Sequence, residues 1–221
     1  ASSPFFNPAA TAGYSVLVTD AAGCTAAGQV TVTVLPLPLV DAGADALVCL
    51  GNGVPVGGSP TSATGTTFTW SPAAGLNDAS SPNPLASPTS TTTYTVVVAD
   101  ANACTAKDSI TVDVSPTPVL DGGADTSFCA GGSVQLDATG VGTFSWSPNT
   151  GLSDPAVSGP VASPQGTTVY RVTLTDGNNC TASDSVTVTV NPLPAVDAGA
   201  NTWLCLGSSV TLTGSGAGAY A

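Results

Sequence analysis

The sequence repeats itself, and this repetition constrains the fold more than any other feature. Three cysteines stand in similar segments, VCLGNGV at Cys49, FCAGGSV at Cys129 and LCLGSSV at Cys205, spaced by 80 and 76 residues. A second set with the same two spacings comprises Cys24, Cys104 and Cys180. The motif WSP…GL also occurs twice, 76 residues apart. Self-similarity of this period is typical of a tandem array of small domains.

The repeats divide the chain at proline-rich seams. The segments LPLPLVDAGAD, SPTPVLDGGAD and NPLPAVDAGAN are nearly identical, and proline at alternate positions favours extended, semi-rigid backbone. We therefore expect complete repeats at 39–118 and 119–194, the back part of a repeat at 1–38 and the front part of another at 195–221.

Within a repeat, the hydrophobic period is two. Apolar residues alternate with mostly polar residues in VYRVTLTD (169–176) and DSVTVTV (184–190), and more briefly in SVQLDA (133–138). This alternation is typical of half-buried antiparallel strands, and DANA and DGNN predict the turns between the last two strands. No segment has helical periodicity. About seven short strands per repeat predict an all-β array of immunoglobulin-like sandwiches.

Composition excludes several classes of function. The chain has no His and no Glu, all 14 acidic residues are Asp, and the formal net charge is −12. Such a chain repels nucleic acid, and it has no His for general acid–base catalysis. No membrane-length apolar run and no signal peptide is present. Six cysteines in a Thr/Ser/Gly/Pro-rich chain favour an oxidising, extracellular setting.

The repeats resemble a known class of bacterial domain. The run CAGGSVQL, FSWSPNTGLS and PVASPQGTTVYRVTLTDGNNCTASDSVTVTV (129–190), with its counterpart from Cys49 to Val114, is similar to the PKD-type and immunoglobulin-like repeats of large secreted proteins in Bacteroidota-type gliding bacteria. The resemblance covers the chain and implies a cell-surface adhesin, stalk or filament. It departs from the antibody pattern because the second cysteine follows the tyrosine by ten residues.

The cysteines are interpreted as disulfide partners rather than zinc ligands, since there is neither a CxxC motif nor a histidine. Pairing within a repeat would give Cys49–Cys104 and Cys129–Cys180. If these cysteines lie at opposite ends of a sandwich, bridging fails, and Cys49 would instead bond Cys180 of the next repeat. Under either scheme Cys24 and Cys205 need partners outside the fragment or in adjacent chains.

The repeated aromatic residues are interpreted mainly as core. Trp70 and Trp146 occupy equivalent positions, and the residues Tyr14, Tyr94 and Tyr170 each precede a cysteine by ten residues. Packing between two sheets explains such equivalence, although a tryptophan can also stack on a sugar. Trp203 has no aromatic counterpart and is therefore a candidate exposed contact residue.

Acidic pairs at the seams raise the question of calcium. Asp41, Asp45, Asp121 and Asp125 occur in DxGxD segments, where carboxylates could hold Ca²⁺ between domains. The alternative is that these residues bond their own turns as Asx motifs. No other cofactor is expected.

Two serines match a modification pattern of the resembled bacteria. Ser109 in DSI and Ser185 in DSV fit their short Asp-Ser-apolar O-glycosylation pattern, and an unmodified exposed strand position is the alternative. Asn179 begins a formal N-glycosylation sequon, which a bacterial protein is not expected to use.

The predicted function is therefore non-catalytic. We expect a rigid, disulfide-strengthened extracellular stalk or filament at the cell surface, with neighbouring repeats and other copies as partners and no membrane insertion. An array that binds surface glycans is the alternative. Residues 195–221 and 1–38 read as complementary parts of one repeat that lack about nine residues between them, which suggests a window cut from a longer array.

Overall fold

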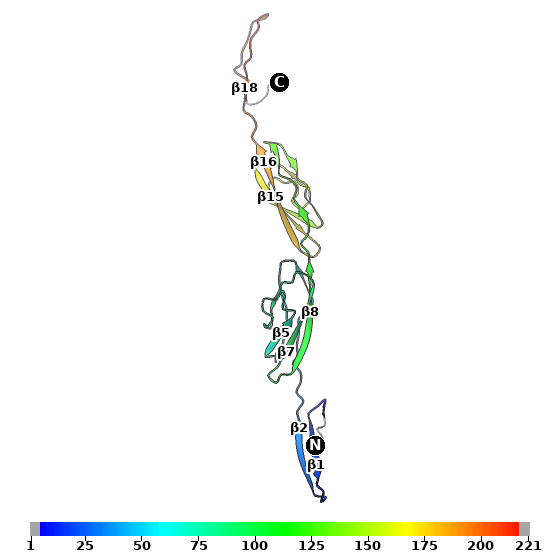
Figure 1. Ribbon diagram of the computed structural model, residues 1–221. Helices are drawn as coiled ribbons and strands as arrows, with labels where there is room; N and C mark the ends of the chain where they lie inside the picture. Colours follow the sequence, from blue (N-terminus) through cyan, green and yellow to red (C-terminus); the bar gives the residue numbers. More distant parts are fainter. Residues whose placement is uncertain (1–4, 217–221) are drawn as a thin grey trace. The chain divides into compact units, whose positions relative to one another are not determined.

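The computed structural model describes residues 5–216 (Figure 1). Two compact units make up the chain, Ala1–Ser115 and Pro116–Ala221. Each unit contains one sandwich and one two-stranded sheet outside it. All regular elements of the described residues are strands, and no helix there is long and apolar enough to cross a membrane.

The first unit begins with a hairpin and continues with a six-stranded sandwich. The hairpin is β1 (Ala12–Thr19) and β2 (Thr25–Val32). The sandwich strands are β3 (Ala46–Cys49), β4 (Val54–Pro55), β5 (Thr67–Ser71), β6 (Leu85–Ala86), β7 (Thr92–Ala99) and β8 (Thr105–Ser115). One sheet has the order β3-β8-β7-β5, and β4 pairs with β6 in the other.

The second unit repeats these six strands, adds the short antiparallel pair β9–β12, and ends in another short strand pair. Its strands are β9 (Leu120–Asp121), β10 (Thr126–Cys129), β11 (Val134–Gln135), β12 (Thr139–Gly140), β13 (Thr143–Ser147), β14 (Val161–Ala162), β15 (Thr168–Thr175) and β16 (Thr181–Asn191). The four-stranded sheet has the order β10-β16-β15-β13. β17 (Val196–Asp197) pairs with β18 (Ser215–Gly216). The segment 133–138, which the alternation predicted as one strand, contributes only two residues to β11.

The longest strand pair organises each sandwich. β7 and β8 are antiparallel and lie side by side in Figure 1, as do β15 and β16. The first strand of each sheet, β3 or β10, runs parallel to the last strand and pairs with its final residues. This strand order, with a second small sheet closing the core, gives an immunoglobulin-like β-sandwich.

The core explains the alternation in the sequence. Tyr94, Val96 and Val98 of β7 are fully buried, as are the equivalent residues of β15, because every second side chain points between the sheets. Trp70 and Trp146 lie in the two cores, and their indole N–H groups donate to Ser81 O and Val157 O. Burial also raises the pKa of Tyr94 and Tyr170 above the ordinary tyrosine value, since desolvation disfavours the phenolate.

The hairpin β1–β2 has the same alternation of apolar residues as β7 and β8, but its apolar side chains are exposed. Val16, Val18 and Val30 are each about 60% exposed, whereas their counterparts in β7 and β8 are buried. In the sandwich that face is covered by the front part of the repeat, including Trp70. Tyr14, predicted as a core residue, is partly exposed and contacts the ring of Phe6. A place for Tyr14 in a core therefore stays a prediction.

Amide hydrogen exchange tests this difference in burial between the hairpin β1–β2 and the strand pair β7–β8. A two-stranded hairpin without a packed face is marginally stable, so we expect the amides of β1 and β2 to exchange more than about a hundredfold faster than those of β7 and β8. Mass spectrometry or NMR of the full chain measures both sets in one sample. The equivalent pair β15–β16 is the internal control for a protected hairpin. Equal protection in β1–β2 would mean that its apolar face is covered in solution.

Candidate functional sites at the two ends of the sandwich

The cysteines of each sandwich lie at its two ends. We call the end that carries the β7–β8 or β15–β16 turn the leading end, because the linker enters there. The trailing end is where the last strand finishes, at Ser115 or Asn191.

At the leading end, an aspartate fixes the position of a cysteine. The carboxylate of Asp100 accepts hydrogen bonds from the backbone N–H groups of Asn102 (2.8 Å) and Cys104 (2.9 Å). Asp176 binds Asn178 and Cys180 at the same two distances. Asp20 repeats the arrangement for Cys24. The residue before each of Cys104 and Cys180 has a positive φ, which completes the tight turn. The DANA and DGNN turn predictions are thus confirmed.

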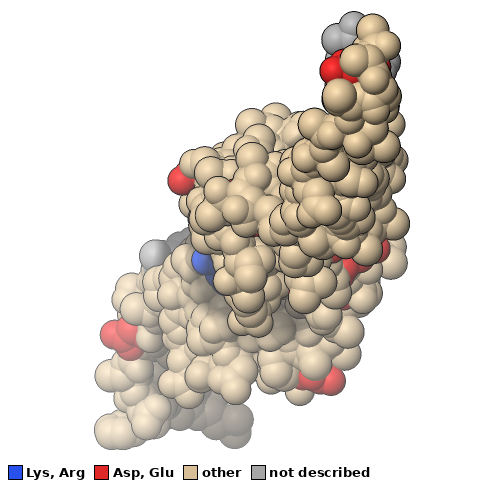
Figure 2. Space-filling view, turned by 90° about the horizontal axis from the view of Figure 1, so that it is seen from below, with Lys and Arg blue, Asp and Glu red and all other residues tan. Residues whose placement is uncertain are grey.

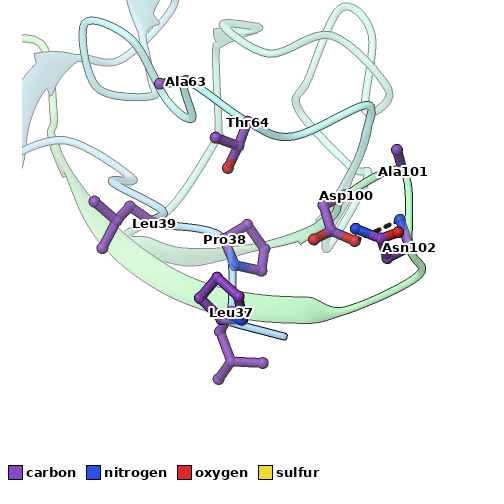
Figure 3. A pocket seen from close by; sticks show the side chains of 9 residues that line it. Leu37, Pro38, Leu39, Ala63, Thr64, Asp100, Ala101 and Asn102 are labelled. Carbon is purple, nitrogen blue, oxygen red and sulfur yellow. Dashed lines mark hydrogen bonds between the residues drawn. The ribbon is translucent and has the colours of Figure 1, made fainter. Parts of the chain in front are cut away.

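The linker passes close to this turn. In the first unit, Leu37, Pro38 and Leu39 line a hollow of about 340 Å³ together with the turn residues Asp100 and Asn102 (Figure 3). A hollow in the second unit has equivalent lining residues: Pro118, Val119, Thr139, Gly140, Val141 and Asp176. The chain therefore enters each sandwich beside the turn that holds its second cysteine.

At the trailing end, a second cysteine lies beside the last residue of the repeat. Cys49 closes β3 and is in register with Ser115, the final residue of β8. Cys129 has the same relation to Asn191. A turn follows each of these cysteines, in which Gly51 or Gly131 adopts a φ of 89° or 86° that favours glycine. The pairing with the last strand thus places the cysteine next to the point where the linker leaves.

The two cysteines of one repeat are consequently far apart. Cys104 directly precedes β8, and Cys49 lies beside its far end, so eleven strand residues separate them. At about 3.3 Å per residue the separation is roughly 35 Å. A disulfide requires Cα atoms within about 7 Å.

The bonding states agree with this geometry. Cys49 and Cys180 are disulfide-bonded, whereas Cys24, Cys104, Cys129 and Cys205 carry free thiols. The predicted pairs Cys49–Cys104 and Cys129–Cys180 are therefore not formed in the structure, because the strand length holds their members at opposite ends.

The aspartates predicted as calcium ligands bond backbone amides. Asp41 and Asp121 accept from Gly43 and Gly123 two residues on, as Asx turns do. Asp45 accepts from Thr111 N (2.8 Å) and Asp125 from Thr187 N (2.7 Å). Within residues 5–216 no group of three or more Asp, Cys or His side chains is placed to hold a metal ion. On the face shown in Figure 2, acidic side chains are scattered over a largely uncharged surface.

The serines predicted as glycosylation sites lie exposed on the last strand. Ser109 in β8 pairs with Thr95, and Ser185 in β16 pairs with Arg171. The aspartate before each serine has a structural role that the sequence did not suggest. Asp108 accepts from Ala42 N and Asp184 from Gly122 N, both at 2.9 Å, which ties the seam loop to the strand. Glycosylation of the serines stays a prediction.

The strand order and core place each sandwich in the immunoglobulin-like class. No family model matches the chain, and no curated protein matches it. Solved structures that match include the first two Ig domains of DIP-gamma (13% identity, 70% of this chain, 98% of that chain, TM-score 0.31). The I-band fragment I67–I69 of titin matches at 12% identity over 82% of this chain and 75% of that chain, with a TM-score of 0.35. The insect immune protein hemolin matches at 15% identity over 81% of this chain and 56% of that chain, with a TM-score of 0.37.

The hydrogen bond from Gly122 N to Asp184 predicts how the stability of the second unit depends on pH. The backbone N–H groups of Gly122 and Ser185 lower the pKa of Asp184 below its ordinary value of 3.8. Because the folded-state pKa is depressed, the carboxylate stabilises the second unit above the unfolded-state pKa. That contribution is lost as the pH falls through the lower, folded-state value.

We therefore expect Asp184→Asn to destabilise the second unit at neutral pH and to make its stability less sensitive to acid. Amide NMR signals of β15 and β16, followed in denaturant from pH 7 to below pH 3, provide the measurement. Asp137→Asn, at an exposed position of the same unit, is the matched control. An unchanged acid response in Asp184→Asn would contradict the assigned role.

Proposed function

We propose that this chain is part of a non-catalytic, extracellular array of immunoglobulin-like repeats with a structural or adhesive role. The observation that carries the proposal is that one sandwich is built twice with the same internal bonds. Tyr94 and Tyr170 donate from their hydroxyl groups to Ala74 O and Thr150 O, at 3.0 and 2.8 Å. The residues able to perform chemistry thus recur as scaffold, which is expected of a spacer.

The array would consist of repeats bounded at 1–38, 39–118, 119–194 and 195–221, as in the sequence analysis. The proline-rich linkers are short, which favours limited freedom between successive repeats. The similarity of CAGGSVQL and WSP…GL to repeats of gliding bacteria supports a stalk or filament at a bacterial cell surface. Disulfides would strengthen it, as six cysteines in an acidic secreted chain suggest.

The exposed hairpin face supports neighbouring repeats as partners. Val16 and Val18 of β1 point to one face of the hairpin and are 60% and 61% exposed, and Val30 of β2 is 61% exposed. In the sandwich, the front part of a repeat covers the equivalent of this face. We propose that the front part of a repeat, from the same protein or from another copy, covers it in the assembled array.

A glycan-binding array is the alternative, and one residue favours it. Trp203 is 89% exposed and has no aromatic counterpart in the other repeats. An exposed indole can stack on the apolar face of a sugar. Trp70 and Trp146 are buried and are not available for such stacking.

A glycan-array screen of the full chain separates the two functions. For a spacer we expect no glycan signal that depends on an exposed aromatic side chain, so the wild type and Trp203→Ala should give the same background. Leu206→Ala, which removes another exposed apolar side chain nearby, is the matched control. Reproducible binding that Trp203→Ala abolishes and Leu206→Ala retains would replace the spacer proposal with the binding one.

A further inference from the structure

The six cysteines follow one pairing rule, which rests on the proposed array of repeats. We propose that the trailing-end cysteine of each repeat forms a disulfide with the leading-end cysteine of the next repeat. Cys49 then bonds Cys180, and every seam of the array is bridged covalently. Successive repeats of the proposed stalk are then joined by disulfides as well as by the linkers.

The positions of the cysteines within each unit support the rule. Cys49 lies beside Ser115, which is followed by the linker Pro116-Thr117-Pro118. In the second unit Pro118 lines the hollow at Asp176, the residue that fixes Cys180. Only a few linker residues therefore separate the trailing end of one repeat from the leading end of the next. The roughly 35 Å between the ends of one repeat is set by a rigid strand pair and offers no such approach.

The bonding states support it independently. In the 221 residues, a trailing-end cysteine is followed by the leading-end cysteine of the next repeat only for Cys49 and Cys180. These are the two disulfide-bonded cysteines, and the four cysteines without such a counterpart in the sequence carry free thiols.

The rule also assigns the free cysteines. Cys129 lies at a trailing end and would bond the leading-end cysteine of a following repeat, and Cys104 would bond the trailing-end cysteine of a preceding one. Each bond joins two thiols with the loss of two electrons and two protons. A small-molecule or protein disulfide of the extracellular space is the oxidant, and it is reduced to two thiols by exchange.

Trypsin gives a direct test, because Lys107 and Arg171 are the only cleavage sites and yield three peptides, 1–107, 108–171 and 172–221. The full chain is refolded with oxidised and reduced glutathione, alkylated without reduction, unfolded and digested. We expect peptide 1–107 to be joined to 172–221, with 108–171 separate and alkylated at Cys129. A bond between 108–171 and 172–221 would join Cys129 to Cys180 or to Cys205, and either pairing would overturn the rule, as would the absence of any joined peptides.

Two matched variants identify the bonded cysteine within peptide 1–107. Cys49→Ser should separate 1–107 from 172–221 and leave Cys180 open to alkylation, whereas Cys104→Ser should leave the two peptides joined. Near-UV circular dichroism of both variants and of the reduced wild type checks that the sandwiches fold without the bond. If peptides 1–107 and 172–221 stay joined in Cys49→Ser, the proposal is refuted. None of these results depends on glycan binding, so the rule and the spacer function can fail separately.

Stretching single full-length molecules from their ends provides a second readout. The bond removes the 131 residue steps between Cys49 and Cys180 from the path of the force. We expect the fully extended length to be shorter by roughly 430–470 Å in the oxidised chain than in the reduced chain, at about 3.3–3.6 Å per residue. Cys49→Ser should show the longer extension without reductant, and Cys104→Ser should not. Equal lengths with and without reductant would refute the bond.

Discussion

The antiparallel pair formed by the last two strands of each repeat is the element on which the rest of the structure depends. Its inner face supplies much of the buried core, including Tyr94 and Tyr170 with their valine and leucine neighbours. Its turn fixes one cysteine through an aspartate carboxylate, and its far end positions the other through the parallel partner strand. Because the last strand has eleven residues, the two cysteines stand at opposite ends of the sandwich. The length of one strand therefore decides which disulfides are geometrically available.

Much of this arrangement follows from the sequence, because its causes are local. Alternation in VYRVTLTD predicts strand β15 and its buried face, and the Asp-containing turns follow from the ability of Asp to accept from amides two and four residues on. Repetition of the same pattern adds a check that a single domain does not offer. The short strands β4, β6, β11 and β14 contain two residues each and have too little sequence to carry a period.

The cysteine pairing and the state of the hairpin could not be fixed from sequence, since both depend on groups distant along the chain. Cys49 and Cys104 belong to one repeat, and only the parallel register of β3 with the end of β8 shows that they cannot meet. Tyr14 has the same local sequence context as Tyr94 but is partly exposed, because burial depends on residues far along the chain and not on the local sequence. The ties from Asp108 and Asp184 to the seam loops were missed because each spans more than 60 residues. Their recurrence in both repeats was the one available signal.

Bridging between repeats has a mechanical consequence that bridging within repeats would not have. A bond inside one repeat protects that sandwich but leaves the proline-rich linker as the continuous path through which tension passes. Under the proposed rule, the loop from Cys49 to Cys180 encloses Cys129, whose own bond would reach into the following repeat. Successive loops then overlap, so every linker lies inside at least one closed loop. A chain of small domains with modest cores gains resistance to extension in this way without more buried surface, which suits repeats with about eighty residues and few charged side chains.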